Sequence, residues 1–582
     1  MTLSTENAEQ TKLNAGYRRW PAREGWLLAF GVSLAAALLM VAPFYWLGTP
    51  SGHDIGFHAG SWLDAAEQWK EGILYPRWTE WANHGFGEPR FIFYPPLSWM
   101  LGAGLGFAMP WNAVPTVFIV LVQTFAGMSA FALARRLISE RASLFGAFCY
   151  AANPNALLIV YIRSDFAELL ASAFFPLLFL AAFELSGILE RRKRSAPRGV
   201  ALFGILFAAA WLSNAPAGVL ASYSLALVFA WAAMRERSWR PLDRGAAGLA
   251  LGFGLAAVYI LPAAYEQRWV NIAQAISAGL LPRDNFLFTQ TNDPEHTLFN
   301  WVASGTAVLM IALTGLAALA ALRRSADDAR DGERKKCHQA LLLLSAGATL
   351  LMLRFTAIFW DVLPKLRFVQ FPWRWMSILA VAFAVFLAAA VERRRFAALW
   401  ITLVVAILAG TGALQGKQGW WDGEDLAAAQ DAVEQKAGFD GTDEYDPAGD
   451  DHTDLPVNAP MVSAVNSSDQ RASPTGARVQ IEEWSAEEKR VQVNAKKPVR
   501  IALRLIDYPA WRVEVNGKPV QVDHPAGTEQ MIVPLGAGES RIDVHFNRTP
   551  DRTLGIGISL VGALTLLALF HVCGRRPLSA SP

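Results

Sequence analysis

The segment from Gly25 to Leu47, GWLLAFGVSLAAALLMVAPFYWL, decides the fold class because it contains no charged residue. A helix of about 20 apolar residues crosses the hydrocarbon core of a bilayer. Similar apolar runs recur along the chain of 582 residues, which is 53% hydrophobic and only 18% charged. The sequence therefore predicts a polytopic membrane protein and excludes a soluble, disordered or fibrous chain.

Charge and cysteine content exclude further classes of protein. The formal net charge of +2 provides no electrostatic footprint for nucleic acid, so we expect no such partner. Cys149, Cys337 and Cys573 lie within or beside apolar runs, and we expect neither a disulfide framework nor a zinc cluster. The first apolar run is longer than the core of a signal peptide, which predicts a signal anchor that stays in place.

Basic clusters predict the orientation, because loops rich in Lys and Arg stay in the cytoplasm. We place there Arg18, Arg19 and Arg23; Arg135, Arg136 and Arg141; Arg191–Arg194; Arg235–Arg244; Arg323 with Lys335 and Lys336; Arg393–Arg395; and Arg575 with Arg576. The apolar runs between them predict about twelve spans with both termini inside. These spans are 25–48, 113–134, 143–161, 166–188, 199–213, 217–234, 245–264, 299–322, 338–354, 374–391, 396–414 and 553–573.

This topology divides the chain into five parts: a cytoplasmic tail (1–24), a transmembrane module (25–414), an outer domain (415–552), a final span (553–573) and a second tail (574–582). The module has outer loops at 48–112, 265–298 and 355–373. The apolar stretch Tyr94–Met109 is short and opens with two prolines, so we expect a juxtamembrane helix that does not span, and the same holds for Ile358–Gln370.

The outer domain is predicted to be β-rich from about residue 478, after a short helix over 426–436. Asn516-Gly517 is a strong hairpin signal, and Pro519 indicates that the returning strand is short or at an edge. We expect a small antiparallel sandwich built from strands at 479–483, 490–495, 499–505, 511–515, 520–522, 531–533 and 541–546.

The first candidate site follows the first span, at Ser51-Gly52-His53-Asp54-Ile55-Gly56-Phe57-His58. Asp54 has no Lys or Arg nearby in the sequence, so it is either a site acid or an ordinary helix-capping residue. A divalent metal held by His53, Asp54, His58 and Asp64 is a further interpretation, although the spacing fits no zinc pattern. Beyond it, Trp62, Ala66 and Trp69 share one helical face, which we expect to lie on the membrane.

Two further candidate sites place ionisable groups at the outer surface. Arg163, Asp165 and Glu168 lie between two spans with almost no loop, where charges are costly unless paired or facing water. They are either functional or, in the alternative, an Arg163–Glu168 pair that locks two helices. The segment 364–374 carries Lys365, Arg367 and Arg374 on the outer side, suited to an anion such as phosphate or to lipid head groups.

An acid after the first span, followed by the Tyr94-Pro95-Pro96-Leu97 helix, resembles the GT-C superfamily of membrane glycosyltransferases. More narrowly, the chain resembles the bacterial and archaeal membrane proteins called "6-pyruvoyl-tetrahydropterin synthase-related". The motifs that carry this likeness are His53-Asp54 with Phe57-His58, Arg163 with Glu168, Leu261-Pro262-Ala263 with Glu266, Gln370-Phe371-Pro372-Trp373-Arg374, Asp443-Glu444-Tyr445-Asp446-Pro447 and Tyr508-Pro509-Ala510-Trp511-Arg512-Val513. His53 replaces the first of two adjacent acids that many superfamily members carry.

The resemblance implies a mainly α-helical GT-C-like bundle in the bacterial inner membrane, with the active site and the β domain on the periplasmic side. It implies transfer of a sugar from a polyprenyl-phosphate donor to a glycan, lipid or protein acceptor, with Asp54 as general base and inversion at the anomeric carbon. Asp165 or Glu168 matches the second acid. The expected substrate-binding residues are His53, His58, Arg163, Glu266, Lys365, Arg367, Gln370, Trp373 and Arg374.

Besides substrates, we expect membrane lipids as partners, and a divalent metal remains an open alternative. Two other functions also remain open. A transporter or flippase of lipid-linked glycans would also carry charges at membrane depth, although it would usually show related halves. A non-catalytic scaffold that presents the β domain would not need Asp54, Glu168 and Arg374 to converge on one outer pocket.

Overall fold

The computed structural model describes residues 22–190, 196–322, 331–392, 397–417, 419–448, 452–465, 477–525 and 527–574. Within these ranges ten helical stretches are long and apolar enough to cross a membrane. They comprise α2 (Ala22–Val41) with α3 (Phe44–Leu47), α8 (Val114–Leu137), α9 (Glu140–Ala151) with α10 (Pro154–Leu158) and η2 (Ile159–Arg163), α11 (Phe166–Ser186), α12 (Ala196–Ser213), α13 (Ala215–Glu236), α16 (Pro294–Leu322), α19 (Met376–Val391), α20 (Ala397–Gln415) and α22 (Pro550–Gly574).

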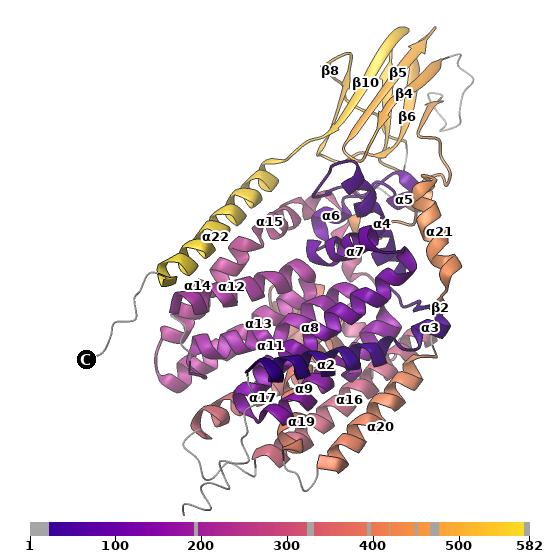
Figure 1. Cartoon of the computed structure of the whole chain (residues 1–582). Helices are drawn as coiled ribbons and strands as arrows, with labels where there is room; N and C mark the ends of the chain where they lie inside the picture. The colour runs from indigo at the N-terminus through magenta and orange to yellow at the C-terminus, as the bar shows by residue number, and fades with distance from the viewer. Residues whose placement is uncertain are drawn as a thin grey trace, which may run out of the picture.

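Two bent helix pairs raise the number of spans to as many as twelve, the number expected from the sequence. α14 (Arg240–Leu255) meets α15 (Ala257–Glu266) at 75°, and α17 (Asp331–Leu351) meets α18 (Ala357–Val362) at 90°. The basic clusters Arg18 with Arg19, Arg191–Arg194, Arg323, Arg393–Arg395 and Arg575 with Arg576 lie outside the described residues. In Figure 1 the β sheets lie at one end of the bundle, and α22 runs from them along α15 and α14.

The segment 48–112, which the sequence predicts to be the first outer loop, folds into short helices between the bundle and the β sheets (Figure 1). They are α4 (Ile55–Lys70), α5 (Ala82–Gly85), α6 (Arg90–Phe93) and α7 (Pro96–Ala108). α7 has 13 residues, which is too short to span a bilayer, as the sequence predicted.

The expectation that α4 lies on the membrane through Trp62 and Ala66 was wrong. Both residues are buried, and Trp62 stacks on Phe118 of α8 with ring centroids 5.3 Å apart. A Cβ atom on Gly102 of α7 would lie 2.3 Å from the Trp62 ring, so a glycine is needed where α7 crosses this side chain. The apolar face of α4 is therefore covered by protein.

The outer domain is an antiparallel sandwich, as predicted. One sheet has the order β4-β5-β10-β7-β8 and the other β3-β6-β9. Their apolar faces share a core that includes Val491, Ile501, Val533 and Ile542. The strands are β3 (Val462–Val465), β4 (Arg478–Trp484), β5 (Glu488–Ala495), β6 (Val499–Ile506), β7 (Trp511–Val515), β8 (Lys518–Pro519), β9 (Gln530–Leu535) and β10 (Gly538–Phe546).

Two details of this domain differ from the sequence-based expectation: β3 was not predicted, and one predicted strand is absent. The strand expected at 520–522 is absent: β8 covers only Lys518–Pro519, although the Val520 N–H still donates to the Val513 carbonyl of β7 at 3.0 Å. Asn516 and Gly517 both adopt positive φ and form the expected hairpin turn. The helix α21 (Gly423–Glu434) precedes the sandwich, close to the expected position.

Candidate active site at the outer ends of the membrane helices

The turn that carries Asp54 is docked on the end of a membrane helix. The N–H groups of His53 and Asp54 donate to the carbonyls of Ile162 and Arg163 at 3.1 and 2.8 Å. A Cβ atom on Gly52 would lie 2.6 Å from the carbonyl carbon of Arg163, so this close approach requires glycine. Two segments distant in sequence are thereby held in backbone contact, which fixes where the Asp54 side chain points.

The helix that leads to Arg163 is irregular. Asn153 caps α10, and the following turn from Ile159 to Arg163 is a π-helix. Ser164 then adopts a left-handed conformation with φ 51°. π-turns of this kind frequently mark functional sites. Here the π-turn and Ser164 bring Arg163 and Asp165 to the same outer end of the bundle.

Five side chains form a line of alternating charges, which we call the charge chain: Asp54, Arg163, Asp165, Arg374 and Glu168. Arg163 Nη2 lies 2.5 Å from Asp54 and 3.8 Å from Asp165. Arg374 lies 3.2 Å from Asp165 through Nη2 and 2.9 Å from Glu168 through Nε. The alternative of an Arg163–Glu168 pair was therefore wrong. Arg163 bridges Asp54 and Asp165, whereas Arg374 bridges Asp165 and Glu168.

The three acids of the charge chain differ in their access to solvent. The Asp54 side chain is 31% exposed, whereas those of Asp165 and Glu168 are 4% and 1% exposed. Asp165 also caps α11, because its Oδ1 accepts the Glu168 N–H at 2.8 Å. A molecule that arrives from solvent therefore meets the carboxylate of Asp54 first.

Arg374 is held by the segment that precedes α19. Its Nη1 donates to the Val369 carbonyl at 3.0 Å and to Gln370 Oε1 at 3.3 Å. Gln370 has φ 65°, a strained conformation for a residue other than glycine, and its Nε2 donates to the Ala275 carbonyl at 2.6 Å. The second outer loop is thus pinned to the residue that positions Arg374.

Aromatic rings form one wall beside the charge chain. Phe371 and Trp373 stack with centroids 5.0 Å apart, and the Arg163 guanidinium lies 4.8 Å and 5.5 Å from their centroids. Phe299 of α16 lies 5.4 Å from Trp373 and 5.4 Å from the His53 ring. The predicted residues His53 and Trp373 therefore lie together with Arg163 at this wall.

His58 lies on the opposite side of Asp165, with Nε2 3.8 Å from its carboxylate. Burial alone would raise the pKa of Asp165, but His58, Arg374 and Arg163 together hold it below the usual range of a carboxyl. Burial and the nearby Arg163 cation lower the pKa of His53. Asp165 is therefore a permanent anion near neutral pH, and His53 is a neutral imidazole.

Tyr94 is a site residue that the sequence reasoning used only as a helix marker. Its ring lies 5.9 Å from His58 and 4.6 Å from Phe57. Burial raises the pKa of Tyr94 well above the usual value, and the carboxylates of Asp165 and Asp54 contribute to the shift. The signal available in the sequence was a phenol directly before the Pro-Pro that begins α7.

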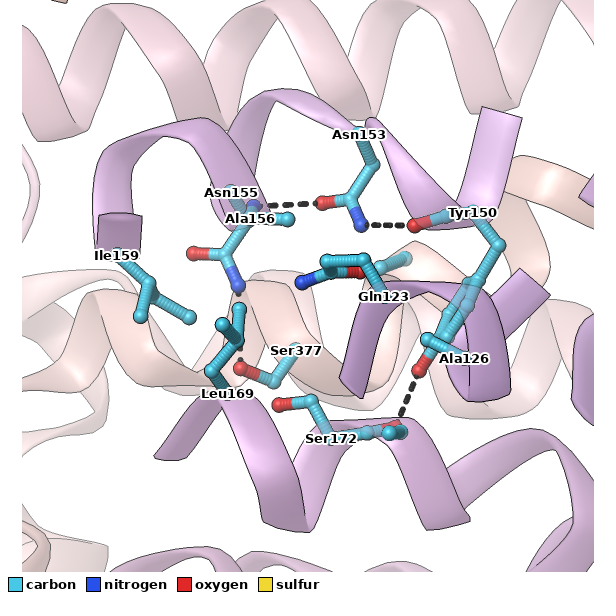
Figure 2. A pocket seen from close by; sticks show the side chains of 12 residues that line it. Gln123, Ala126, Tyr150, Asn153, Asn155, Ala156, Ile159, Leu169, Ser172 and Ser377 are labelled. Carbon is cyan, nitrogen blue, oxygen red and sulfur yellow. Dashed lines mark hydrogen bonds between the residues drawn. The ribbon is translucent and has the colours of Figure 1, made fainter. Parts of the chain in front are cut away.

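A small polar cavity lies next to Glu168, inside the bundle (Figure 2). Ser377 donates to Glu168 Oε1 at 3.1 Å, and Asn155 Nδ2 donates to Ser377 at 3.1 Å. Asn155 Oδ1 is buried without a hydrogen-bond partner among the described residues. The cavity has about 10 Å³ open to the centre of a water molecule, close to the roughly 10–15 Å³ that one water needs. The sequence analysis missed this polar support of Glu168.

Glu266 belongs to a separate cluster that ties the modules together. It is fully buried and accepts from Arg552 Nε and Nη2 at 2.7 and 2.8 Å, and from the Tyr508 hydroxyl at 2.7 Å. Arg552 begins α22, and Tyr508 belongs to the sandwich. The structure therefore places Glu266 between α15 and the outer domain, apart from the charge chain.

Lys365 and Arg367 also lie outside the charge chain. Lys365 Nζ donates to Gln267 at 3.1 Å, and both cations lie about the Phe368 ring at 4.9 and 5.2 Å. Neither forms an ion pair with a residue that the structure describes. Both are exposed on the segment that also carries Gln370, so they are cations available to an incoming anion.

The predicted metal ligands do not come together. Asp64 is buried and bonded to the Trp81 N–H at 2.7 Å and to Gln68 at 2.5 Å. Asp54 is instead paired with Arg163. In the part of the chain that the structure describes, no group of three His, Cys, Asp or Glu side chains is arranged to hold a metal ion.

Several solved membrane proteins show distant overall similarity to this structure. The archaeal oligosaccharyltransferase AglB from Archaeoglobus fulgidus, in complex with an inhibitory peptide and a dolichol-phosphate, is 15% identical with a TM-score of 0.38, over 71% of this chain and 56% of that one. The arabinofuranosyltransferase AftD from Mycobacteria is 18% identical with a TM-score of 0.41, over 68% of this chain and 28% of that one. ArnT from Cupriavidus metallidurans, bound to undecaprenyl phosphate, is 13% identical with a TM-score of 0.31, over 72% of this chain and 90% of that one.

The chain thus spans about half the length of the archaeal protein and a smaller part of AftD. No curated protein matches the sequence significantly. A family model does match it, over residues 91–415, which is more than half of the chain. The resemblance seen in the motifs is therefore confirmed, and the chain belongs to the 6-pyruvoyl-tetrahydropterin synthase related domain family of membrane proteins.

Proposed function

We propose that this protein is a glycosyltransferase that moves a sugar from a polyprenyl-phosphate donor to an extracytoplasmic acceptor, with Asp54 as general base. The observation that carries the proposal is the charge chain, in which Asp54 is the only acid with a substantial exposed fraction. The donor class comes from the GT-C-like motifs around Asp54, Tyr94 and Arg374.

The energetic cost of the charge chain supports a role in chemistry. Buried ions lose several kcal/mol of hydration, and ionisable groups at membrane depth are functional candidates by default. Here two arginines hold three carboxylates, which come from the first outer loop and from the start of α11. The excess acid lies at the end that solvent reaches, where a base must meet its substrate.

Phosphate recognition falls to the cations that lack an acidic partner. Arg374 donates to two carboxylates and two further oxygens, which leaves little of its guanidinium for a ligand. We therefore assign Arg374 to positioning the acids. Arg367 and Lys365, exposed on the same segment, bind the donor phosphate, and Arg163 faces the sugar at the aromatic wall.

In the proposed step, Asp54 removes the proton from an acceptor hydroxyl as its oxygen attacks the anomeric carbon. The bond between that carbon and the phosphate oxygen breaks, and the polyprenyl phosphate leaves with the bonding electron pair. The cations of Arg367 and Lys365 stabilise the charge that grows on the phosphate. Attack from the side opposite the phosphate inverts the anomeric carbon.

The test supplies purified protein in lipid nanodiscs with polyprenyl-phosphate sugars and measures release of the lipid phosphate. Release that depends on an added hydroxyl acceptor and is lost in Asp54→Asn supports the proposal. No release with any donor sugar, combined with movement of the lipid-linked sugar across proteoliposomes, would instead make the protein a transporter. If neither release of the lipid phosphate nor movement of the lipid-linked sugar is observed, the scaffold function is the one that remains.

A further inference from the structure

A second hollow lies on the sandwich, away from the charge chain. It is lined by the end of β6, by β7 and by the segment that follows β8: Asp507, Trp511, Val513, Val520, Gln521, Val522 and His524. Its volume of about 220 Å³ is below the roughly 300–1,000 Å³ of pockets that hold drug-sized ligands. The hollow therefore suits a ligand about the size of a single sugar ring.

The lining of this hollow is amphipathic. The partly exposed Val520 and Val522 supply apolar surface beside the buried Trp511 and Val513, whereas Asp507, Gln521 and His524 supply a carboxylate, an amide and an imidazole. A hexopyranose has the same division, with an apolar C–H face and a rim of hydroxyl groups. Apolar side chains such as aromatic rings bind the apolar C–H face, and side chains that both donate and accept hydrogen bonds bind the rim of hydroxyl groups.

The polar groups are held in place before any ligand arrives. His524 Nε2 lies 3.1 Å from Asp507 Oδ2 and 3.6 Å from Glu529 Oε2. The Asp507 N–H also donates to the Glu529 carbonyl at 2.7 Å. This arrangement orients the Asp507 carboxylate, and an ionised acceptor forms the stronger class of hydrogen bond with a hydroxyl.

The hollow is built next to the contact between the sandwich and the membrane module. Tyr508, the neighbour of Asp507, donates to the buried Glu266 of α15 at 2.7 Å. Trp511 packs against Trp78 of the first outer loop with centroids 5.5 Å apart. Trp511 thus belongs both to the hollow and to the contact with the loop in which Asp54 lies.

We propose that this hollow, formed by Asp507, Trp511, Gln521 and His524, binds one hexose residue of a glycan. Binding itself stands on the pocket geometry, whereas its assignment as a site for the acceptor glycan rests on the proposed function. The polar side chains hydrogen-bond neighbouring hydroxyl groups of the ring, and the side of the hollow formed by Val520 and Val522 receives its C–H face.

The experiment is saturation-transfer difference NMR on the full chain in nanodiscs. The probes are the methyl glycosides of glucose, galactose, mannose and N-acetylglucosamine. We expect saturation transfer to ring protons of at least one probe at millimolar concentration. Gln521→Ala and His524→Ala should each weaken this binding about tenfold at most, the range for one lost hydrogen bond, and the double variant should abolish the signal.

Gln480→Ala is the matched control, because Gln480 is an exposed glutamine on β4, at the opposite edge of the same sheet from β7 and β8. It should bind like the unmodified protein. Asp54→Asn should also keep the binding, which separates this site from the proposed base. Saturation transfer from none of the four probes, or an undiminished signal in the double variant, overturns the proposal, whatever the outcome of the transfer assay.

Discussion

The carboxylate of Asp54 lies 2.5 Å from the guanidinium of Arg163, although 109 positions separate the two residues in the sequence. The contact depends on the backbone hydrogen bonds between 53–54 and 162–163 and on the glycine at position 52. One carboxylate oxygen is held by the arginine, while the side chain stays partly open to solvent. Asp54 is thus a fixed, accessible acid at the outer end of the bundle.

Replacing Asp54 with Asn should abolish most sugar transfer while the fold is retained. The change is nearly isosteric, and the loss of a general base typically lowers a rate by about 10²–10⁴. Initial rates of lipid-phosphate release and the thermal unfolding midpoint should be measured on the same preparation. Asp422→Asn is the matched control, since Asp422 caps α21 in the outer domain and should change only stability.

Full transfer activity in the Asp54→Asn protein would remove Asp54 as the base. Asp165 would then be the next candidate to test, because its carboxylate contacts the same Arg163 guanidinium. A loss of activity accompanied by a large fall in the unfolding midpoint would point instead to a structural role for the Asp54–Arg163 pair.

The sequence predicted the elements of the fold well, because their signals are local. Apolar runs such as 25–47 mark spans by length alone, and alternation with turn residues marked most of the strands. The failures involve partners distant in sequence. The Trp62 face was assigned to lipid because nothing local shows that α7 and α8 cover it.

Candidate residues were likewise easier to predict than their pairing. Charges at membrane depth singled out Arg163, Asp165 and Glu168, cations predicted on the outer side singled out Arg374, and the structure brings all four together. Which acid each arginine holds depends on the π-turn and on the strained Gln370, neither of which has a reliable sequence signal. Glu266 was grouped with these residues through motif likeness alone, and its partners lie in other modules.

Arg374→Ala should mainly lower the stability of the protein, whereas Arg367→Ala should mainly weaken its use of the donor. Removing Arg374 leaves the buried Glu168 without its arginine and leaves Asp165 with only Arg163, and breaking such a buried pair typically costs about 3–5 kcal/mol of stability. Removing the exposed Arg367 should leave the unfolding midpoint unchanged and weaken donor use about tenfold, the loss of roughly 1.4 kcal/mol of phosphate binding. The measurements are thermal unfolding and the donor concentration at half-maximal release.

For the Arg374 site, Arg374→Lys provides a milder variant that keeps the charge and loses the bidentate fork. If Arg374→Lys were as stable as the unmodified protein and bound donor more weakly, Arg374 would be a phosphate ligand. Normal donor use by Arg367→Ala would remove Arg367 from that role.

The predicted orientation can be tested by labelling the hairpin that carries Asn516 and Gly517. Lys518 is exposed at the edge strand β8, so a cysteine there should react with a membrane-impermeant maleimide in intact spheroplasts. The protein that receives this new cysteine should carry alanine in place of Cys149, Cys337 and Cys573. Modification only after lysis would place the sandwich in the cytoplasm and contradict both the orientation and the donor chemistry.

Asp64 should make the stability of the outer loops depend on pH. Its burial raises the pKa from the usual value of 3.8 to about 7, despite hydrogen bonds from Trp81 and Gln68. Between about pH 4 and pH 7 the folded state therefore holds a proton that the unfolded chain has released, so stability falls as the pH rises through this window and levels off above it.

Thermal midpoints from pH 4.5 to 8 should show this slope, and Asp64→Asn should flatten it. A remainder of the slope should come from Glu444, because burial also raises the pKa of Glu444 to about 7. Asp431→Asn, at an exposed position of α21, should keep the full slope. An equal slope in the Asp64→Asn and unmodified proteins would show that Asp64 is ionised in the folded state throughout this range.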